Sequence, residues 1–291
     1  MGYAILKNEF FITAENIEKY IAYLKDEERA TATIEKYIRD IRAFAVFLNG
    51  AEVTKQAASQ WKDALLQTRA PVTVNAMIIG INGFFEFFEL GIKVKPLKIH
   101  RSTFLSEEKE LTIAEYNRLL EAAKTRNERI YCIMQTICST GIRVSELKFI
   151  TAEATMNGQA EIRNKGKIRV IFIPHDLKNL LLQYMQNHKI DSGIIFKTKT
   201  GAPLDRSNIW TAMKNLCAAA GVDGSKVFPH NLRRLFARTF YAKERDIIKL
   251  SDILGHSDCK TTRIYIMDTG CEHRRIVNSL GLVAPVCDDC S

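Results

Sequence analysis

The sequence predicts a mainly α-helical protein of two domains, with one small β-hairpin in the second domain. Three observations lead to this prediction. Apolar residues recur at helical spacing through 11–90 and again through most of 106–291. A basic segment at 93–105, which contains a proline and no acidic residue, separates these two regions. One stretch of the second region alternates polar and apolar residues around a turn, which is typical of a hairpin.

Residues 1–92 are predicted to form a small all-α domain of four or five short helices. The segment ENIEKYIAYLKDEE places Ile17, Tyr20 and Leu24 on one helix face. The segment TATIEKYIRDIRAFAVFLNG repeats this pattern and ends at Gly50, where a glycine cap is common. Two further helices are predicted in SQWKDALLQ and TVNAMIIGINGFFEFFELG.

Positive charge is concentrated in the later part of the chain. The net charge is +9. Up to residue 105 there are 14 basic and 12 acidic residues, and after it there are 28 and 21. This excess favours a polyanionic partner such as nucleic acid, although a soluble protein with a lysine-rich surface gives the same count. The linker at 93–105 carries Lys93, Lys95, Lys98 and Arg101. These charges either keep the linker solvated or let it bind the phosphates of a DNA duplex that it crosses.

The second domain is predicted over 106–291. Its opening LTIAEYNRLLEAA has Thr112 as an N-cap and Glu115 at capping-box spacing. The segment AEIRNKGKIRVIFIP predicts the hairpin, with its turn at 164–166. After Pro174 the helical pattern returns. The predicted helices are 175–189, 205–220, 229–242, 246–254 and 261–267, and the tail EHRRIVNSLGLV allows one more.

Composition argues against several classes of protein. The chain has seven cysteines, and an odd, scattered set fits reduced thiols better than disulfides. Cys287 and Cys290 have CxxC spacing, but no second pair accompanies them, so a loose tail is favoured over a zinc site. No stretch approaches the ~20 apolar residues of a membrane span, and the N-terminus has no leader pattern. We expect a cytoplasmic protein that uses no metal and no cofactor.

Four short segments carry residues suited to phosphodiester chemistry. STGIRVSEL contains Arg143 and Glu146, NKGKIRV contains Lys165, PHNLRRLF contains His230 and Arg233, and LGHSDCKTTRIY contains His256 and Tyr265. Cleavage of a phosphodiester needs a nucleophile, a proton for the leaving oxygen, and cations near the phosphoryl oxygens. A tyrosine hydroxyl can form an ester with phosphorus, and a guanidinium can donate two parallel hydrogen bonds to phosphate oxygens.

These properties assign provisional roles. Tyr265 is the predicted nucleophile, and the alternative for it is a helix tyrosine packed on the core. Arg143 and Arg233 are the predicted charge clamp, which could replace a divalent metal. Glu146 lies three residues after Arg143 and is predicted to hold or orient it.

The order and spacing of the four segments resemble those of the tyrosine recombinases, the phage-integrase family. The shared order is an arginine, a lysine on a hairpin, H-x-x-R, L-G-H, and a tyrosine nine residues after that histidine. The N-terminal helices and LTIAEYNRLL are also similar, so the resemblance covers nearly the whole chain. It implies a helical, SAM-like core-binding domain at 1–92 and an α-rich catalytic domain at 106–291.

The resemblance also implies roles for the remaining polar residues. His230 would assist proton transfer at the nucleophile and contact the phosphate, and His256 would give that phosphate a further hydrogen bond. Lys165 would be the general acid for the leaving 5′-oxygen. The family pattern K-G-x-K-x-R is shortened here to K-G-K-I-R, and we favour Lys165 over Lys167.

The implied activity is site-specific cutting and rejoining of duplex DNA through a 3′-phosphotyrosine, without metal or ATP. The implied assembly is a homotetramer on two DNA sites with exchange of C-terminal tails, with or without an accessory or directionality protein. Xer-like recombinases and simple integrases of mobile elements both fit. A type IB topoisomerase and a non-cleaving DNA-binding accessory are the alternatives, and an unrelated helical scaffold would need five accidental matches. The DNA target, and the choice among integration, excision and chromosome-dimer resolution, stay open.

The spacing of His256 and Tyr265 requires a break in the helix. Nine residues of continuous helix turn through about 900°, which would place the two side chains on opposite faces. A break at 255–258, with a new helix from near Thr261, would let both reach one phosphate. Such a break would also allow the tyrosine segment to move and so switch the site on or off.

Overall fold

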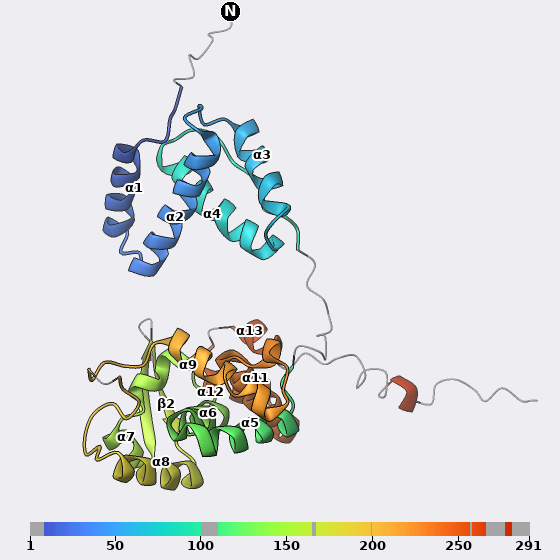
Figure 1. Cartoon of the computed structure of the whole chain (residues 1–291). Coiled ribbons are helices and arrows are strands. Elements are labelled where there is room, and N and C mark those ends of the chain that lie inside the picture. Colours follow the sequence, from blue (N-terminus) through green and yellow to red (C-terminus); the bar gives the residue numbers. More distant parts are fainter. Residues whose placement is uncertain are drawn as a thin grey trace, which may run out of the picture. The chain divides into compact units, whose positions relative to one another are not determined.

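Helices make up most of the chain, and the sheet is a single hairpin in the part that the structure describes. The computed structural model describes residues 9–99, 110–164, 167–198, 200–256, 258–265 and 277–280, without the side chains of Asn164 and Lys167. The chain divides into two compact units, Met1–Arg101 and Ser102–Ser291. Figure 1 shows both, and the predicted fold class is confirmed.

The first unit is a group of four helices around an aromatic core. They are α1 (Ala14–Asp26), α2 (Thr31–Leu48), α3 (Lys55–Leu66) and α4 (Pro71–Phe87). Helix α2 contacts the other three. Trp61 of α3 is buried, with its ring centroid 5.0 Å from that of Phe44 of α2. The left-handed cap of α2 is Asn49, one residue before the predicted Gly50.

Two asparagines of α4 hold the chain segment that follows this helix. Asn82 donates to the Val94 carbonyl at 2.9 Å and accepts from the Val94 amide at 2.9 Å. Asn75, about two turns earlier, pairs in the same way with Leu97, at 2.9 and 2.7 Å. Each side-chain amide therefore satisfies both backbone groups of one residue, as a neighbouring strand would. The opening residues of the predicted linker pack on the first unit.

The second unit is built around helix α6 (Glu128–Thr140), which contacts helices on several sides. The other elements are α5 (Ile113–Arg126), η2 (Val144–Phe149), α7 (Ala152–Asn157), α8 (His175–Asn187), α9 (Arg206–Lys214), α10 (Cys217–Ala220), η3 (Gly224–Lys226), α11 (Pro229–Glu244), α12 (Ile247–Leu254) and α13 (Cys259–Arg263). The predicted capping box of α5 is confirmed: the Glu115 amide donates to Thr112 Oγ1 at 3.1 Å, and the Thr112 amide donates to Glu115 Oε2 at 2.8 Å.

The predicted hairpin is formed by β1 (Gln159–Asn164) and β2 (Lys167–Phe172), which pair antiparallel. Asn164 pairs with Lys167, so the paired strands are two residues apart in the sequence. The inner face packs in the core through Ala160, Ile162 and Ile171. The outer face of β2 exposes Ile168, Val170 and Phe172.

Two predicted helices differ from those observed. The helix predicted at 205–220 is interrupted between α9 and α10. The helix predicted at 261–267 begins earlier and ends sooner, since α13 covers Cys259–Arg263 and leaves Tyr265 beyond its end. The predicted break before it is present: α12 ends at Leu254 and is capped by Gly255, which has φ +64°. In the described ranges, no helix has the length and apolar character needed to cross a membrane.

Candidate active site

Arg143 is placed by a glycine turn at the end of α6. Gly141 has φ +67°, and a Cβ there would lie 2.4 Å from a ring carbon of Phe236, so only glycine fits this turn without a shift. Arg143 then precedes the 3-10 helix η2. Its backbone amide donates to Glu146 Oε2 at 2.8 Å, and its Nη1 donates to Glu146 Oε1 at 3.0 Å. The predicted partnership of these two residues is present, at the start of a 3-10 turn.

Glu146 also binds a second arginine, Arg169 of β2. The two bonds from Arg169 are 2.7 Å from Nη2 to Oε2 and 3.2 Å from Nη1 to Oε1. Burial alone would raise the pKa of Glu146, but hydrogen bonds from Arg169 and Arg143 lower it below its ordinary value. The carboxylate is therefore ionised and shared between two guanidinium groups.

Arg233 lies in the interior, on the first turns of α11. Its exposed fraction is 1%, which is rare for an arginine. Nη1 donates to the Gly141 carbonyl, and Nη2 donates to the Leu254 carbonyl at 2.7 Å. No described residue meets hydrogen-bond geometry with its buried Nε. Burial, and then the nearby charge of Arg143, lower the pKa of Arg233 to about 10, so it stays protonated at neutral pH.

His256 is held as a neutral ring of one tautomer. Arg233 Nη2 lies 2.9 Å from His256 Nε2, and because a guanidinium can only donate, Nε2 accepts. The proton is then on Nδ1, which donates to Thr262 Oγ1 at 2.8 Å. Burial and then the charges of Arg233, Arg143 and Arg169 lower the pKa of His256 to about 4. The ring is therefore uncharged at pH 7.

Tyr265 lies between two imidazole rings. Its ring centroid is 5.2 Å from that of His230 and 5.2 Å from that of His256. The guanidinium carbon of Arg233 lies 5.9 Å from the ring centroid. The side chain is 7% exposed and packs beside Leu250 and Leu254. The ring is thus packed, as an ordinary core tyrosine would be, but its polar neighbours are the predicted catalytic residues.

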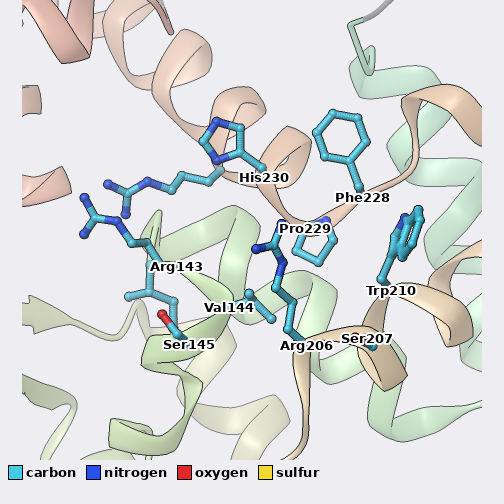
Figure 2. A pocket seen from close by; sticks show the side chains of 11 residues that line it. Arg143, Val144, Ser145, Arg206, Ser207, Trp210, Phe228, Pro229 and His230 are labelled. Carbon is cyan, nitrogen blue, oxygen red and sulfur yellow. The ribbon is translucent and has the colours of Figure 1, made fainter. Parts of the chain in front are cut away.

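A pocket of about 600 Å³ opens beside this cluster. Arg143, His230 and Arg233 line one part of it, and Arg206 and Trp210 of α9 line another. In Figure 2, Arg143 lies across the pocket from Trp210 and Phe228. His230 is exposed to solvent, yet partial burial of its ring, followed by the charges of four nearby arginines, lowers its pKa below the ordinary value.

Comparison with known proteins decides the family. The model of the phage integrase family matches residues 109–270. The chain belongs to the phage integrase family. This phage-integrase protein is 28% identical over 272 residues to the tyrosine recombinase XerA of Thermococcus kodakarensis, over 90% of this chain and 93% of the relative. The predicted membership of the tyrosine recombinases is confirmed.

Two lambda integrase structures share the fold of this phage-integrase protein. A lambda integrase dimer bound to a COC′ core site matches with a TM-score of 0.73 and 18% identity, covering 91% of this chain and 79% of that one. A lambda integrase tetramer bound to a Holliday junction matches with a TM-score of 0.73 and 17% identity, covering 90% of this chain and 79% of that one.

The structure brings together most of the predicted site residues. The clustered residues are Arg143, Glu146, His230, Arg233, His256 and Tyr265. Lys165 lies outside the described residues, as does the side chain of Lys167. Cys287 and Cys290 also lie outside them. Within the described ranges, no group of three or more His, Cys, Asp or Glu side chains is arranged to hold a metal ion.

Three residues of the site were not predicted from the sequence. Arg169 is the last residue of the K-G-K-I-R motif, so its place in the motif was the available signal. Thr262, which fixes the His256 tautomer, lies within the segment quoted for Tyr265. Arg206 had no signal of its own, since it reaches the pocket only because α9 begins there.

Proposed function

We propose that this tyrosine recombinase cuts and rejoins duplex DNA at specific sites through a 3′-phosphotyrosine at Tyr265, without metal or ATP. One observation carries the proposal: Tyr265 is held between His230 and His256, within 5.9 Å of the Arg233 guanidinium, beside a pocket lined by Arg143. The name of the XerA relative describes the same class of enzyme.

Arg143 and Arg233 hold the non-bridging oxygens of the scissile phosphate. The side chain of Arg143 is 35% exposed while its Nη1 is bound to Glu146. The buried Nε–H of Arg233 has no partner among the described residues, and an unpaired buried donor costs about 1–3 kcal/mol. A phosphate oxygen would supply that partner. Two guanidinium groups also provide the positive charge that a divalent metal supplies in other phosphoryl-transfer enzymes.

Proton transfers accompany the attack of Tyr265 Oη on phosphorus. The tyrosine proton passes to His230, whose ring is neutral at pH 7 and therefore has one nitrogen that can accept it. The bond from phosphorus to the 5′-oxygen breaks, and Lys165 protonates that oxygen. The assignment of Lys165 rests on its position in the sequence, between β1 and β2, and on the family pattern. His256 donates a hydrogen bond to the same phosphate. Its proton is on Nδ1 in this structure, so either the proton moves to Nε2 or the ring turns before this bond forms.

Rejoining reverses these steps with a different strand. A 5′-hydroxyl from a partner duplex attacks the phosphotyrosine, and Tyr265 recovers its proton as it leaves. One phosphoester bond forms for each one broken, so the reaction needs no ATP. The product is a DNA strand joined to a new neighbour.

Duplex DNA is the partner that this chemistry requires. The core-binding domain is residues 1–92 together with the packed segment that contains Val94 and Leu97. The linker follows this segment, and 106–291 form the catalytic domain. The chain acts in the cytoplasm as a homotetramer on two DNA sites, with exchange of C-terminal tails. The net charge of +9 supports the DNA partner, and the likeness of fold to a lambda integrase tetramer bound to a Holliday junction supports the assembly.

Covalent trapping tests the proposal. The protein is incubated with fragmented candidate host DNA in EDTA and denatured, and the ends of the protein-linked DNA are sequenced. Recurrent ends are expected from the wild type. None is expected from Tyr265→Phe, because that variant has no nucleophile. Tyr241→Phe is the matched control, since Tyr241 packs against the same small cluster and should leave trapping intact.

Other outcomes would contradict the proposal in different ways. Scattered ends would indicate a type IB topoisomerase. Intact DNA binding without linked DNA, repeated on a nicked substrate that prevents religation, would indicate a non-cleaving accessory protein. Dependence on added Mg²⁺ would refute the metal-free mechanism.

A further inference from the structure

Arg169 lies where three segments of the site meet. It is on the inner face of β2, opposite Ile162, and its side chain is 14% exposed. Its guanidinium forms two parallel bonds with Glu146, an arrangement that fixes orientation as well as distance. Glu146 in turn accepts bonds from the Arg143 backbone amide and guanidinium. One carboxylate therefore connects the hairpin to Arg143.

The charge of Arg169 affects what Arg143 can offer to a phosphate. Glu146 carries one negative charge and faces two guanidinium groups. If Arg143 were its only partner, the pair would be neutral and its attraction for a phosphate would be weakened. With Arg169 present, the three side chains carry a net positive charge beside the pocket. Arg143 is then oriented by Glu146 without being neutralised by it.

A second contact joins Arg169 to the turn that carries His256. A Cβ on Gly255 would lie 2.6 Å from Arg169 Nη1 and 2.8 Å from its Cδ. Glycine at this position lets the Arg169 side chain pass directly against the turn. His256 follows immediately and bonds Arg233. Arg169 therefore supports both the Arg143 side and the His256 side of the site.

We propose that Arg169 is a positioning residue for DNA cleavage, acting on Arg143 through Glu146 and on His256 through the turn at Gly255. It does this without touching the DNA. The inference rests on the proposed function and adds a residue to it. The alternative is that Arg169 only stabilises the fold of the hairpin.

The test compares two versions of one substrate. The substrate is a nicked duplex containing the site recovered by covalent trapping, with either an ordinary phosphate or an uncharged methylphosphonate at the cleaved position. Arg169→Met should bind DNA normally but cleave the ordinary phosphate about 10–100-fold more slowly, as when supporting partners of metal-site residues are removed. Most of this defect should vanish on the methylphosphonate. Its cleaved group lacks the negative charge that the positive charge of Arg143 stabilises in the ordinary phosphate. Arg163→Met is the matched control, since Arg163 lies on the exposed side of the hairpin and pairs only with Glu161 among the described residues.

Double variants and stability measurements separate positioning from folding. Arg169→Met should slow cleavage by a smaller factor in the Arg143→Ala background than in the wild type, because the route through Glu146 is then already lost and only the support of the Gly255 turn remains. Additive defects, or an equal defect on both substrates with a lowered melting temperature, would overturn the proposal. If Arg169→Met fails to fold, Arg169→Lys keeps the charge and loses the paired bonds, and it should show a smaller defect with the same rescue. Failure of the wild type to form linked DNA would instead remove the proposed function.

Discussion

Replacing Gly141 by alanine tests the close approach between the end of α6 and α11. Gly141 has φ +67°, and its carbonyl accepts a bond from Arg233. A Cβ at this position would lie 2.4 and 2.5 Å from two ring carbons of Phe236 and 3.1 Å from a methyl carbon of Leu254. Both distances to Phe236 are shorter than a normal contact, so the ring or the turn must move.

A matched variant isolates the cost of this clash. Gly158 has φ +73°, and a Cβ added there would meet nothing within 4 Å, so Gly158→Ala carries only the backbone penalty. That penalty is about 1–2 kcal/mol for a left-handed residue. Overpacking in a filled core adds about 1–3 kcal/mol. The free energy of unfolding should therefore fall about 1–3 kcal/mol further in Gly141→Ala than in Gly158→Ala.

Calorimetry of the two variants measures this difference. In a domain of this size, 1 kcal/mol lowers the melting temperature by about 2–4 °C, so Gly141→Ala should melt about 2–12 °C below Gly158→Ala. It should also cleave more slowly, since the Gly141 carbonyl orients Arg233. Equal melting temperatures would show that Phe236 swings aside at no cost, and the steric reasoning would be wrong.

Three further predictions concern other parts of the protein. The pKa of His256 is about 4 in the native protein and about 6.5 when unfolded. Its contribution to stability is complete above pH 6.5 and is lost as the pH falls towards 4, so His256→Gln should show a weaker acid destabilisation in melting curves. Arg206→Ala should weaken DNA binding. It should also reduce the slope of the logarithm of the binding constant against the logarithm of salt concentration by about 1, measured by titration at several salt concentrations. Asn82→Ala leaves the Val94 backbone groups without their partner and should lower the melting temperature of the first unit alone.

Local patterns in the sequence were sufficient for several parts of the site. His230 and Arg233 share a face of α11 because they are three residues apart on a helix. The helix break was predictable because Gly255 adopts a left-handed conformation that glycine favours. The capping of α5 by Thr112 was also predictable, because a capping box is defined by residues only three positions apart.

The orientation of β2 could not be predicted in this way. Ile168, Val170 and Phe172 alternate along the strand, and this apolar pattern would normally face the core. They are exposed, and the opposite face, with Arg169 and Ile171, points inward. On this inward face Arg169 binds the buried carboxylate of Glu146, which is 23 residues away in the sequence, so the strand's own pattern does not reveal this partner. The tautomer of His256 likewise depends on Arg233, which only the folded chain brings near it.

The chain has two tryptophans, and each compact unit contains one of them. Trp61 is 3% exposed in an aromatic core, whereas Trp210 is 47% exposed at the pocket. A buried indole emits at shorter wavelengths than a solvated one, and a bound nucleobase changes the emission of the indole it contacts. An unlabelled sample therefore contains two separate optical reporters, one for the folding of the first unit and one for occupancy of the pocket in the second.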